Sequence, residues 1–247
     1  MIRRLLFLVL GLVLLVGAPA ARAEDATKLP VGEIEKIVKE YLLREPEVIY
    51  QAIQELQRRR DAEEASKQKD LVAQHGDEIF MSKADPVLGN PDGDVTMVEF
   101  FDYHCGYCRS MVPGMRALLE KDTKLRLVMK EFPILGPDSV TASKAALAAA
   151  KQGRYSDMHF ALMGEKDLSE PSVMAVAKRL GLDQEKLAAD MKSPEVASVI
   201  DANMKLAQTL NINGTPSFVI GEEIMGGAAP ISDIQAKIGS LRGGASG

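Results

Sequence analysis

The chain holds only two cysteines in 247 residues, and both lie in one short segment, Phe100 to Cys108. The pair follows an apolar run, Val95 to Phe101, that is typical of a buried strand, and it precedes a segment, Arg109 to Leu119, with helical spacing. Free amides and the positive dipole end at a helix N-terminus stabilise a thiolate. The arrangement therefore predicts a partly exposed nucleophile, Cys105, and a more buried partner with a higher pKa, Cys108.

The first residues have the pattern of a secretory signal. Arg3 and Arg4 precede a short apolar stretch, 5–16, and Ala21-Arg22-Ala23 fits the small-x-small cleavage rule. A membrane span needs about 20 apolar residues, so an uncleaved anchor is the weaker alternative. We therefore expect cleavage after Ala23 and export across the inner membrane to the periplasm, where disulfides persist.

The charge balance argues against some partners. The chain has a formal net charge of −5, and cleavage after Ala23 would remove three arginines, Arg3, Arg4 and Arg22, and no acidic residue. An acidic protein of this kind is a poor candidate for binding nucleic acid or anionic lipid.

The cysteine pair has three other interpretations. A purely structural disulfide would close a very short loop, and short loops gain the least stability from cross-linking. A closed zinc site usually needs four ligands, whereas the two thiols and His104 supply three. Copper(I) binding by the reduced pair stays open, because thiolates suit that ion. Otherwise we expect no metal and no cofactor beyond a redox-active Cys105–Cys108 disulfide.

The rest of the chain separates into a helical segment and an α/β region. Residues 24–83 form a charged N-terminal segment, in which 31–75 carries an apolar helical stripe and 46–75 continues as a mostly polar helix ending at Gly76. Strand and helix signals then alternate, with strands at 95–102, 125–131, 217–220 and 224–226, helices at 105–120 and 231–241, and a helical block at 139–210. This order predicts an α/β fold with a mixed sheet over residues 84–243.

Five further positions, in two segments of the chain, are candidate site residues. Glu99 interrupts a strand that otherwise looks buried on both faces; a buried carboxyl has a raised pKa, which would make Glu99 a proton acceptor for Cys108. The alternative is that Glu99 faces water at a sheet end. Tyr107 and His104 flank the sulfurs, and His104 could tune the thiolate or have no role. His75 and His159 are interpreted as helix-surface residues.

Thr215-Pro216 precedes the strand at 217–220. By physics alone an X-Pro bond is cis in only about 5–6% of cases, so the sequence pattern does not establish a cis bond here.

Taken together, a strand with Glu-Phe-Phe before Cys-x-x-Cys, a helical insertion, and Gly-Thr-Pro before a strand resemble the DsbA-like branch of the thioredoxin superfamily. The resemblance covers about 94–241 and implies a thioredoxin-like fold with a helical insertion. It also implies that Pro216 is cis against Cys105, that Thr215 offers backbone hydrogen bonds to a substrate chain, and that Glu99 occupies the family's buried-acid position.

Two departures refine the expected function. Gly106-Tyr107 and Thr215 resemble the isomerase DsbC rather than the oxidase DsbA, whereas Glu33 to Pro46 and the residues after it resemble the N-terminal helices of ScsC-like proteins. That likeness implies a homo-oligomer, a trimer in that family, assembled through residues 31–75. We therefore expect an exported protein-disulfide oxidoreductase, an isomerase or reductase, that acts on cysteine-containing exported proteins and exchanges electrons with a membrane redox partner. A DsbA-type oxidase and, from another class, a periplasmic copper-binding or holdase protein remain alternatives.

Overall fold

The computed structural model describes residues 30–244, so the predicted signal peptide lies outside the described residues. Two compact units divide at Gln57 and Arg58. The helices and strands, in chain order, are α1 (Val31–Arg44), α2 (Glu47–Gln74), the π-helix η1 (Asp77–Met81), β1 (Val87–Gly89), β2 (Val95–Phe101), α3 (Gly106–Lys121), β3 (Leu125–Glu131), α4 (Pro137–Ala150), α5 (Tyr155–Gly164), α6 (Glu170–Arg179), α7 (Gln184–Met191), α8 (Pro194–Thr209), β4 (Ser217–Ile220), β5 (Glu223–Gly226) and α9 (Ile231–Gly244).

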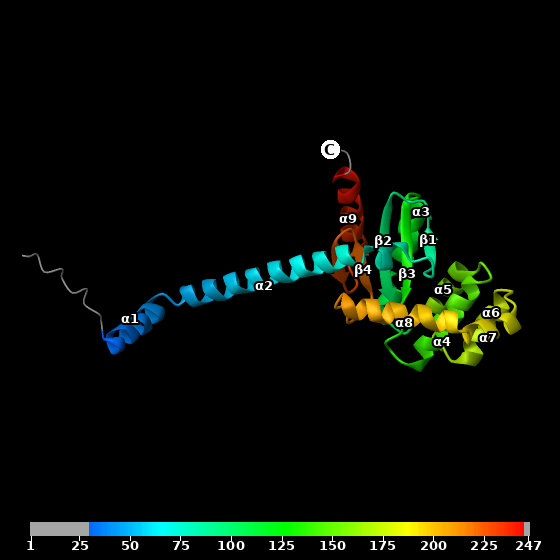
Figure 1. Cartoon of the computed structure of the whole chain (residues 1–247), viewed down its shortest axis with the longest axis horizontal. Coiled ribbons are helices and arrows are strands. Elements are labelled where there is room, and N and C mark those ends of the chain that lie inside the picture. Colours follow the sequence, from blue (N-terminus) through cyan, green and yellow to red (C-terminus); the bar gives the residue numbers. More distant parts are fainter. Residues whose placement is uncertain (1–29, 245–247) are drawn as a thin grey trace, which may run out of the picture. The chain divides into compact units, whose positions relative to one another are not determined.

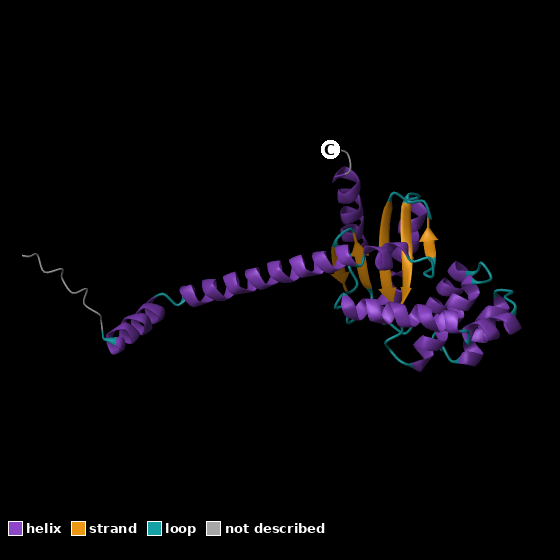
Figure 2. Ribbon diagram, viewed as in Figure 1, coloured by secondary structure: helices purple, strands orange, loops and turns teal. Residues whose placement is uncertain are grey.

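The second unit is built on one sheet with the strand order β1-β3-β2-β4-β5 (Figure 2). The two central strands, β2 and β3, run parallel, and the remaining pairs are antiparallel. This mixed sheet confirms the α/β plan predicted from the sequence. The edge strand β1 was missed, because its three residues lie in a segment, 85–94, rich in Pro, Gly and Asp that favours a loop.

Helices cover both faces of the sheet. One face packs in a core cluster with side chains of α3, α5 and α9, among them Met115, Met158 and Ile234. The other face packs with the end of α2, with η1 and with α8, through Val72, Ile79 and others. Because side chains alternate along a strand, neighbouring residues of β2 and β3 point into different clusters. This alternation decides which of their polar residues lie beside the cysteines.

The helical block predicted at 139–210 is confirmed as helices α4 to α8, inserted between β3 and β4 (Figure 1). Two of these helices begin at side-chain caps, where Asp183 and Ser193 accept hydrogen bonds from the amides of Lys186 and Val196. Such caps satisfy amides that the first helical turn leaves without partners.

The helix α2 does not end at Gly76 in a left-handed cap as predicted. The chain stays helical there, with φ −53° at Gly76, and continues into the π-helix η1. A buried ion pair holds η1 against the sheet: Lys130 Nζ donates to Asp85 Oδ2 and, at 2.7 Å, to the backbone oxygen of Glu78. Asn203 of α8 donates to the same carboxylate at 3.0 Å. The Lys130–Asp85 pair therefore ties three segments together behind the sheet.

The first unit holds α1 and the beginning of α2, and α1 has no buried residue. The predicted apolar stripe is present on a helix but stays exposed, with Ile37 at 55% and Val38 at 50%. Apolar side chains farther on, Ile49 and Ile53, are exposed to a similar degree. Among residues 30–244, no helix has both the length and the apolar character needed to cross a bilayer.

Candidate active site

Cys105 caps the N-terminus of α3, directly after β2, as the sequence predicts. Its sulfur accepts a hydrogen bond from the Cys108 amide at 3.3 Å and donates one to the Thr215 backbone oxygen at 3.2 Å. Both cysteines are free thiols in this structure. Cys105 is only 6% exposed, so the expectation of a partly exposed side chain is wrong; its sulfur is hydrogen-bonded on two sides.

Cys108 lies one turn into α3 and is 1% exposed. Burial is the largest cause that raises the pKa of its thiol far above the ordinary value, and the nearby Glu99 charge adds to this rise. As predicted, the side chain of Cys108 is therefore more deeply buried than that of Cys105. A thiol in such a place needs a neighbouring base to lose its proton.

The Thr215-Pro216 peptide bond is cis, as the family resemblance implied. The bond lies at the start of β4 and brings the Thr215 oxygen to the sulfur of Cys105, although 110 positions separate the two residues in the chain. Pro216 is buried and Thr215 is half-buried. The long separation is bridged because β4 pairs with β2, the strand that leads to Cys105.

Asp102 shapes the turn before the cysteines and was missed by the sequence analysis. Its buried carboxylate accepts hydrogen bonds from the amides of His104 at 2.7 Å and Leu135 at 2.9 Å, and from the Ser139 hydroxyl at 2.7 Å. These three hydrogen bonds give the oxygens of the buried side chain the partners that a buried polar group needs. Asp102 thereby fixes the turn that carries Cys105 against the loop and helix that follow β3.

The two residues predicted to flank the sulfurs are on the surface of the site. Tyr107 is 70% exposed, beside Cys108 on the first turn of α3. His104 is exposed as well, and its Nε2 lies 4.0 Å from Asp138 Oδ2. The substrate-binding role of both residues stays a prediction.

Glu99 is buried, at 5% exposure, so the alternative in which it faces water is wrong. Burial raises the pKa of its carboxyl to about 8. The side chain lines a very small cavity of about 10 Å³ together with Cys108 and His159, on the same face of the sheet as α3. Glu99 is therefore a buried acid beside the inner thiol, and its role as a proton acceptor stays a prediction.

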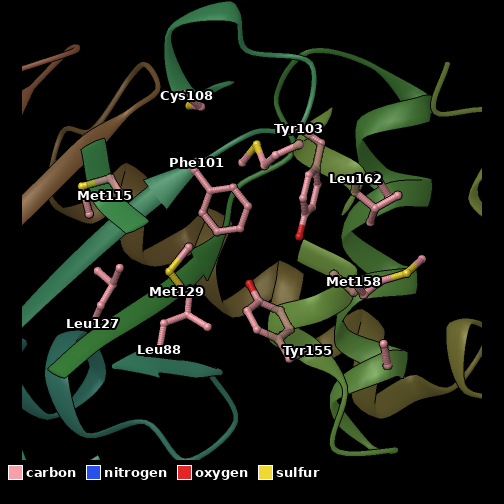
Figure 3. Close-up of a cluster of buried hydrophobic side chains, with 14 of the residues drawn as sticks. Leu88, Phe101, Tyr103, Cys108, Met115, Leu127, Met129, Tyr155, Met158 and Leu162 are labelled. Atoms are coloured by element: carbon pink, nitrogen blue, oxygen red, sulfur yellow. The ribbon is translucent and has the colours of Figure 1, made fainter. Parts of the chain in front are cut away.

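A second group of buried polar residues lies beyond Glu99. Tyr103 and Tyr155 both donate to Glu131 Oε1, at 3.1 and 2.9 Å, and the Tyr103 hydroxyl lies 3.2 Å from His159 Nδ1. Figure 3 shows the hydroxyls of the two tyrosines pointing toward each other in the core. Burial raises the pKa of the Glu131 carboxyl to about 8 and lowers the pKa of His159 to about 3.

The sequence analysis assigned His159 to a helix surface, and that assignment is wrong, because the residue is 3% exposed. Its ring packs against Phe101 with centroids 5.0 Å apart, and against Tyr155 at 5.7 Å. The signal for Glu131 was weaker than that for Glu99, because Glu131 ends the strand β3 after the charged Lys130 and does not interrupt an apolar run.

Among residues 30–244, no three or more histidine, cysteine or acidic side chains are grouped to hold a metal ion.

A family model described as the DSBA-like thioredoxin domain matches residues 96–239, which is more than half of the chain. The chain belongs to the DsbA-like thioredoxin family. The matched segment contains both cysteines, which lie at the N-terminus and in the first turn of α3.

Solved structures support the same family and fold. A thioredoxin-like oxidoreductase from Silicibacter pomeroyi DSS-3 is 46% identical with a TM-score of 0.65, over 67% of this chain and 96% of that one. ScsC of Proteus mirabilis in a transitional conformation is 25% identical with a TM-score of 0.63, over 85% of this chain and 95% of that one. A second family model, described as the copper resistance protein ScsC N-terminal domain, matches residues 32–63. The resemblance to ScsC-like members of the DsbA-like family is therefore confirmed.

A curated relative places the same kind of segment in a larger protein. The Na(+)/H(+) antiporter NhaA 3 of Salinispora tropica is 32% identical over 139 residues, which are 55% of this chain and 21% of the antiporter. The chain thus spans a small part of that relative's length, and the name antiporter describes the relative alone.

Proposed function

We propose that this DsbA-like protein exchanges disulfides in exported, cysteine-containing proteins and that it acts as an isomerase or reductase. The observation that carries the proposal is the pairing of the Cys105 sulfur at the helix N-terminus with the Thr215 carbonyl before a cis-proline. A substrate chain that lies along residue 215 would bring its own disulfide to this sulfur. The proposal includes export to the periplasm, supported by the N-terminal signal pattern.

The proposed cycle begins when the Cys105 thiolate attacks a substrate disulfide. A mixed disulfide forms between Cys105 and one substrate sulfur, and the other substrate sulfur leaves as a thiolate. A substrate thiol can then displace Cys105, which reshuffles the substrate. Alternatively Cys108 attacks Cys105, the Cys105–Cys108 disulfide forms, and the substrate leaves reduced; a membrane redox partner would then restore the dithiol.

The direction of the reaction is inferred from the residues around the sulfurs. Gly106-Tyr107 and Thr215 resemble DsbC-type isomerases, and a buried, proton-retaining Cys108 resolves the mixed disulfide slowly unless a base assists. Slow resolution leaves time for substrate thiols to reshuffle the substrate. Slow resolution therefore favours isomerisation over reduction, whereas the likeness of Gly106-Tyr107 and Thr215 to DsbC-type isomerases is what favours either activity over the dithiol oxidase alternative.

Refolding of ribonuclease A with scrambled disulfides separates the two directions. We expect the reduced full chain to restore ribonuclease activity from the scrambled form, with no added oxidant, because Cys105 can attack non-native disulfides directly. A parallel assay starts from fully reduced ribonuclease and the oxidised chain. Rapid disulfide introduction there, together with no activity regained from the scrambled form, would establish an oxidase instead.

The proposal also assigns residues 31–75 to a homo-oligomer, a trimer by the ScsC likeness. Exposed apolar side chains recur along α1 and the start of α2, including Ile34, Tyr41 and Ile53. A helical face of this kind is stabilised by a partner surface, and a second copy of the same helix offers one. Several active sites would then share one substrate.

Truncation tests the oligomer. Light scattering on residues 24–247 should give a mass of several chains, whereas residues 76–247 should give one, because the exposed stripe is removed. A matched variant, Ile34→Lys with Ile37→Lys in the longer chain, places charges in the stripe and should also give one chain. Equal masses for the longer chain and the shorter one would contradict this assignment.

A further inference from the structure

Two buried carboxyl groups lie on the same face of the sheet, on neighbouring strands. In the parallel register of β2 and β3, Glu99 pairs with Met129 and Phe101 pairs with Glu131. Residues two apart on a strand point to the same side, so Glu99 and Glu131 both face the core that holds Cys108. Phe101 and Met129 lie between the two carboxyl groups and separate them. Any connection between Glu99 and Glu131 therefore has to run through side chains of other elements.

His159 on α5 lies between the surroundings of the two carboxyl groups. Its ring lines the small cavity that Glu99 and Cys108 also line. Its Nδ1 lies 3.2 Å from the Tyr103 hydroxyl, which donates to Glu131 at 3.1 Å. The groups therefore form one buried series from the inner thiol to the second carboxyl: Cys108, Glu99, His159, Tyr103 and Glu131.

The Tyr103 hydroxyl has one hydrogen and two acceptors, which permits two arrangements. In one, the hydroxyl donates to an ionised Glu131, and His159 donates to it from Nδ1. In the other, a protonated Glu131 donates to the hydroxyl, which donates to His159 Nδ1, and the imidazole carries its proton on Nε2. Both arrangements keep the imidazole neutral, as burial requires of His159.

We propose that Glu131 is a second proton-binding group of the active site, connected to Glu99 and Cys108 through His159 and Tyr103. The inference rests on the proposed exchange function, in which Cys108 resolves the mixed disulfide. The step starts from the form in which both carboxyl groups are ionised: Cys108 gives its proton to the Glu99 carboxylate, its thiolate bonds to the Cys105 sulfur, and the substrate sulfur leaves as a thiolate. The proton then moves from Glu99 onto His159 Nε2, while the Nδ1 proton passes to Tyr103 and the hydroxyl proton passes to Glu131.

Two further observations support this role. Burial raises the pKa of both carboxyl groups to about 8, so neither one holds a proton much more tightly than the other. A proton can therefore pass between them without a large cost in free energy. The remaining groups that face Glu131 are Tyr155 of α5, Ser143 of α4 and the Asp102 carboxylate, whose charge opposes ionisation of Glu131. A proton added to Glu131 therefore relieves this repulsion.

The test compares two matched variants of the full chain, Tyr103→Phe and Tyr155→Phe. Each removes one buried hydroxyl that donates to Glu131, but of the two hydroxyls that of Tyr103 is the one bonded to His159. Glutamate carboxyls labelled with ¹³C are titrated by NMR in the reduced and oxidised protein, and Glu131→Gln and Glu99→Gln assign the resonances. His159→Phe, which suits an aromatic surrounding, is a second way to break the connection.

In the wild-type chain we expect oxidation of the cysteines to shift the titrations of both Glu99 and Glu131. Tyr103→Phe and His159→Phe should abolish the response of Glu131, and Tyr155→Phe should retain it. Since a general base contributes about 10²-fold or more, we expect loss of the connection to slow resolution by Cys108 by about three- to tenfold, measured by stopped flow on a mixed disulfide.

If the titration of the Glu131 carboxyl in the wild-type chain were the same in the reduced and the oxidised protein, the inference would be wrong. It would also be wrong if the two tyrosine variants changed the response of Glu131 equally. The same samples are assayed for reduction of insulin disulfides. If the wild-type chain reduces insulin disulfides but the titration of Glu131 does not depend on the redox state, this inference alone is refuted. If the wild-type chain shows no disulfide exchange at all, the proposed function is refuted as well.

Discussion

Cys105→Ala is expected to reduce disulfide exchange by at least about a thousandfold, the scale on which removal of an essential nucleophile acts. No other sulfur can replace it: Cys108, the only other cysteine of the chain, is 1% exposed, and burial holds its pKa so high that it keeps its proton at neutral pH. The rate of insulin reduction and the recovery of scrambled ribonuclease both measure this loss.

Cys108→Ala is the matched control, because it removes the same group one helical turn away. This variant keeps the first attack by Cys105, so it should accumulate a mixed disulfide with the substrate that mass spectrometry detects. Net reduction should stop, while reshuffling through substrate thiols should continue. If Cys105→Ala kept a tenth of the wild-type rate, or if Cys108→Ala were the more damaging of the two, the assignment of nucleophile and resolving thiol would be wrong.

Much of this site could be predicted from local patterns in the sequence. An apolar strand followed directly by Cys-x-x-Cys and a helical pattern fixes the place of Cys105 at a helix N-terminus, because both elements are specified by their own periodicity. Glu99 could be predicted as buried for the same reason, since it interrupts a strand that is apolar on both faces.

Contacts between distant segments could not be predicted in this way. Asp102 owes its role to Leu135 and Ser139, which only the fold brings to it. The buried ion pair of Lys130 and Asp85 could not be predicted either, because charged residues in a sequence pattern indicate a surface position. His159 was misassigned because α5 is buried on more than one side and therefore lacks the polar face that marks a surface helix.

The buried acids and the buried histidine together predict an unusual dependence of stability on pH. The folded-state pKa of Glu99 and of Glu131 is about 8, above the ordinary value of 4.5, so the folded chain holds two protons that the unfolded chain releases between these limits. Stability is then lost as the pH rises from 4.5 to 8. For His159 the folded pKa is about 3, below the ordinary 6.5, so stability is lost as the pH falls from 6.5 to 3.

The two trends together place the maximum of stability near pH 4.5, because above that pH the two carboxyl groups outweigh the single histidine, and the decline on the alkaline side is carried by the two carboxyl groups. Each group costs up to about 1.4 kcal/mol per pH unit, and this slope falls as the pH approaches 8, so the free energy of unfolding should fall by about 3 kcal/mol between pH 6.5 and 8. Urea unfolding of the reduced chain, followed by circular dichroism at half-unit steps of pH, measures this decline.

Glu99→Gln and Glu131→Gln should each remove about half of the decline, because glutamine is neutral and has nearly the shape of the protonated acid. Gln at 131 can also accept the hydrogen bonds from Tyr103 and Tyr155 through its amide oxygen. Glu120→Gln, at an exposed position of α3, removes a carboxyl without altering a buried one and should leave the slope unchanged.

A wild-type chain with constant stability from pH 6.5 to 8 would show that both carboxyl groups ionise freely in the fold. That result would also remove the energetic reason for Glu99 to accept a proton from Cys108, because a base that is ionised at ordinary pH has too little affinity for the proton of so weak an acid.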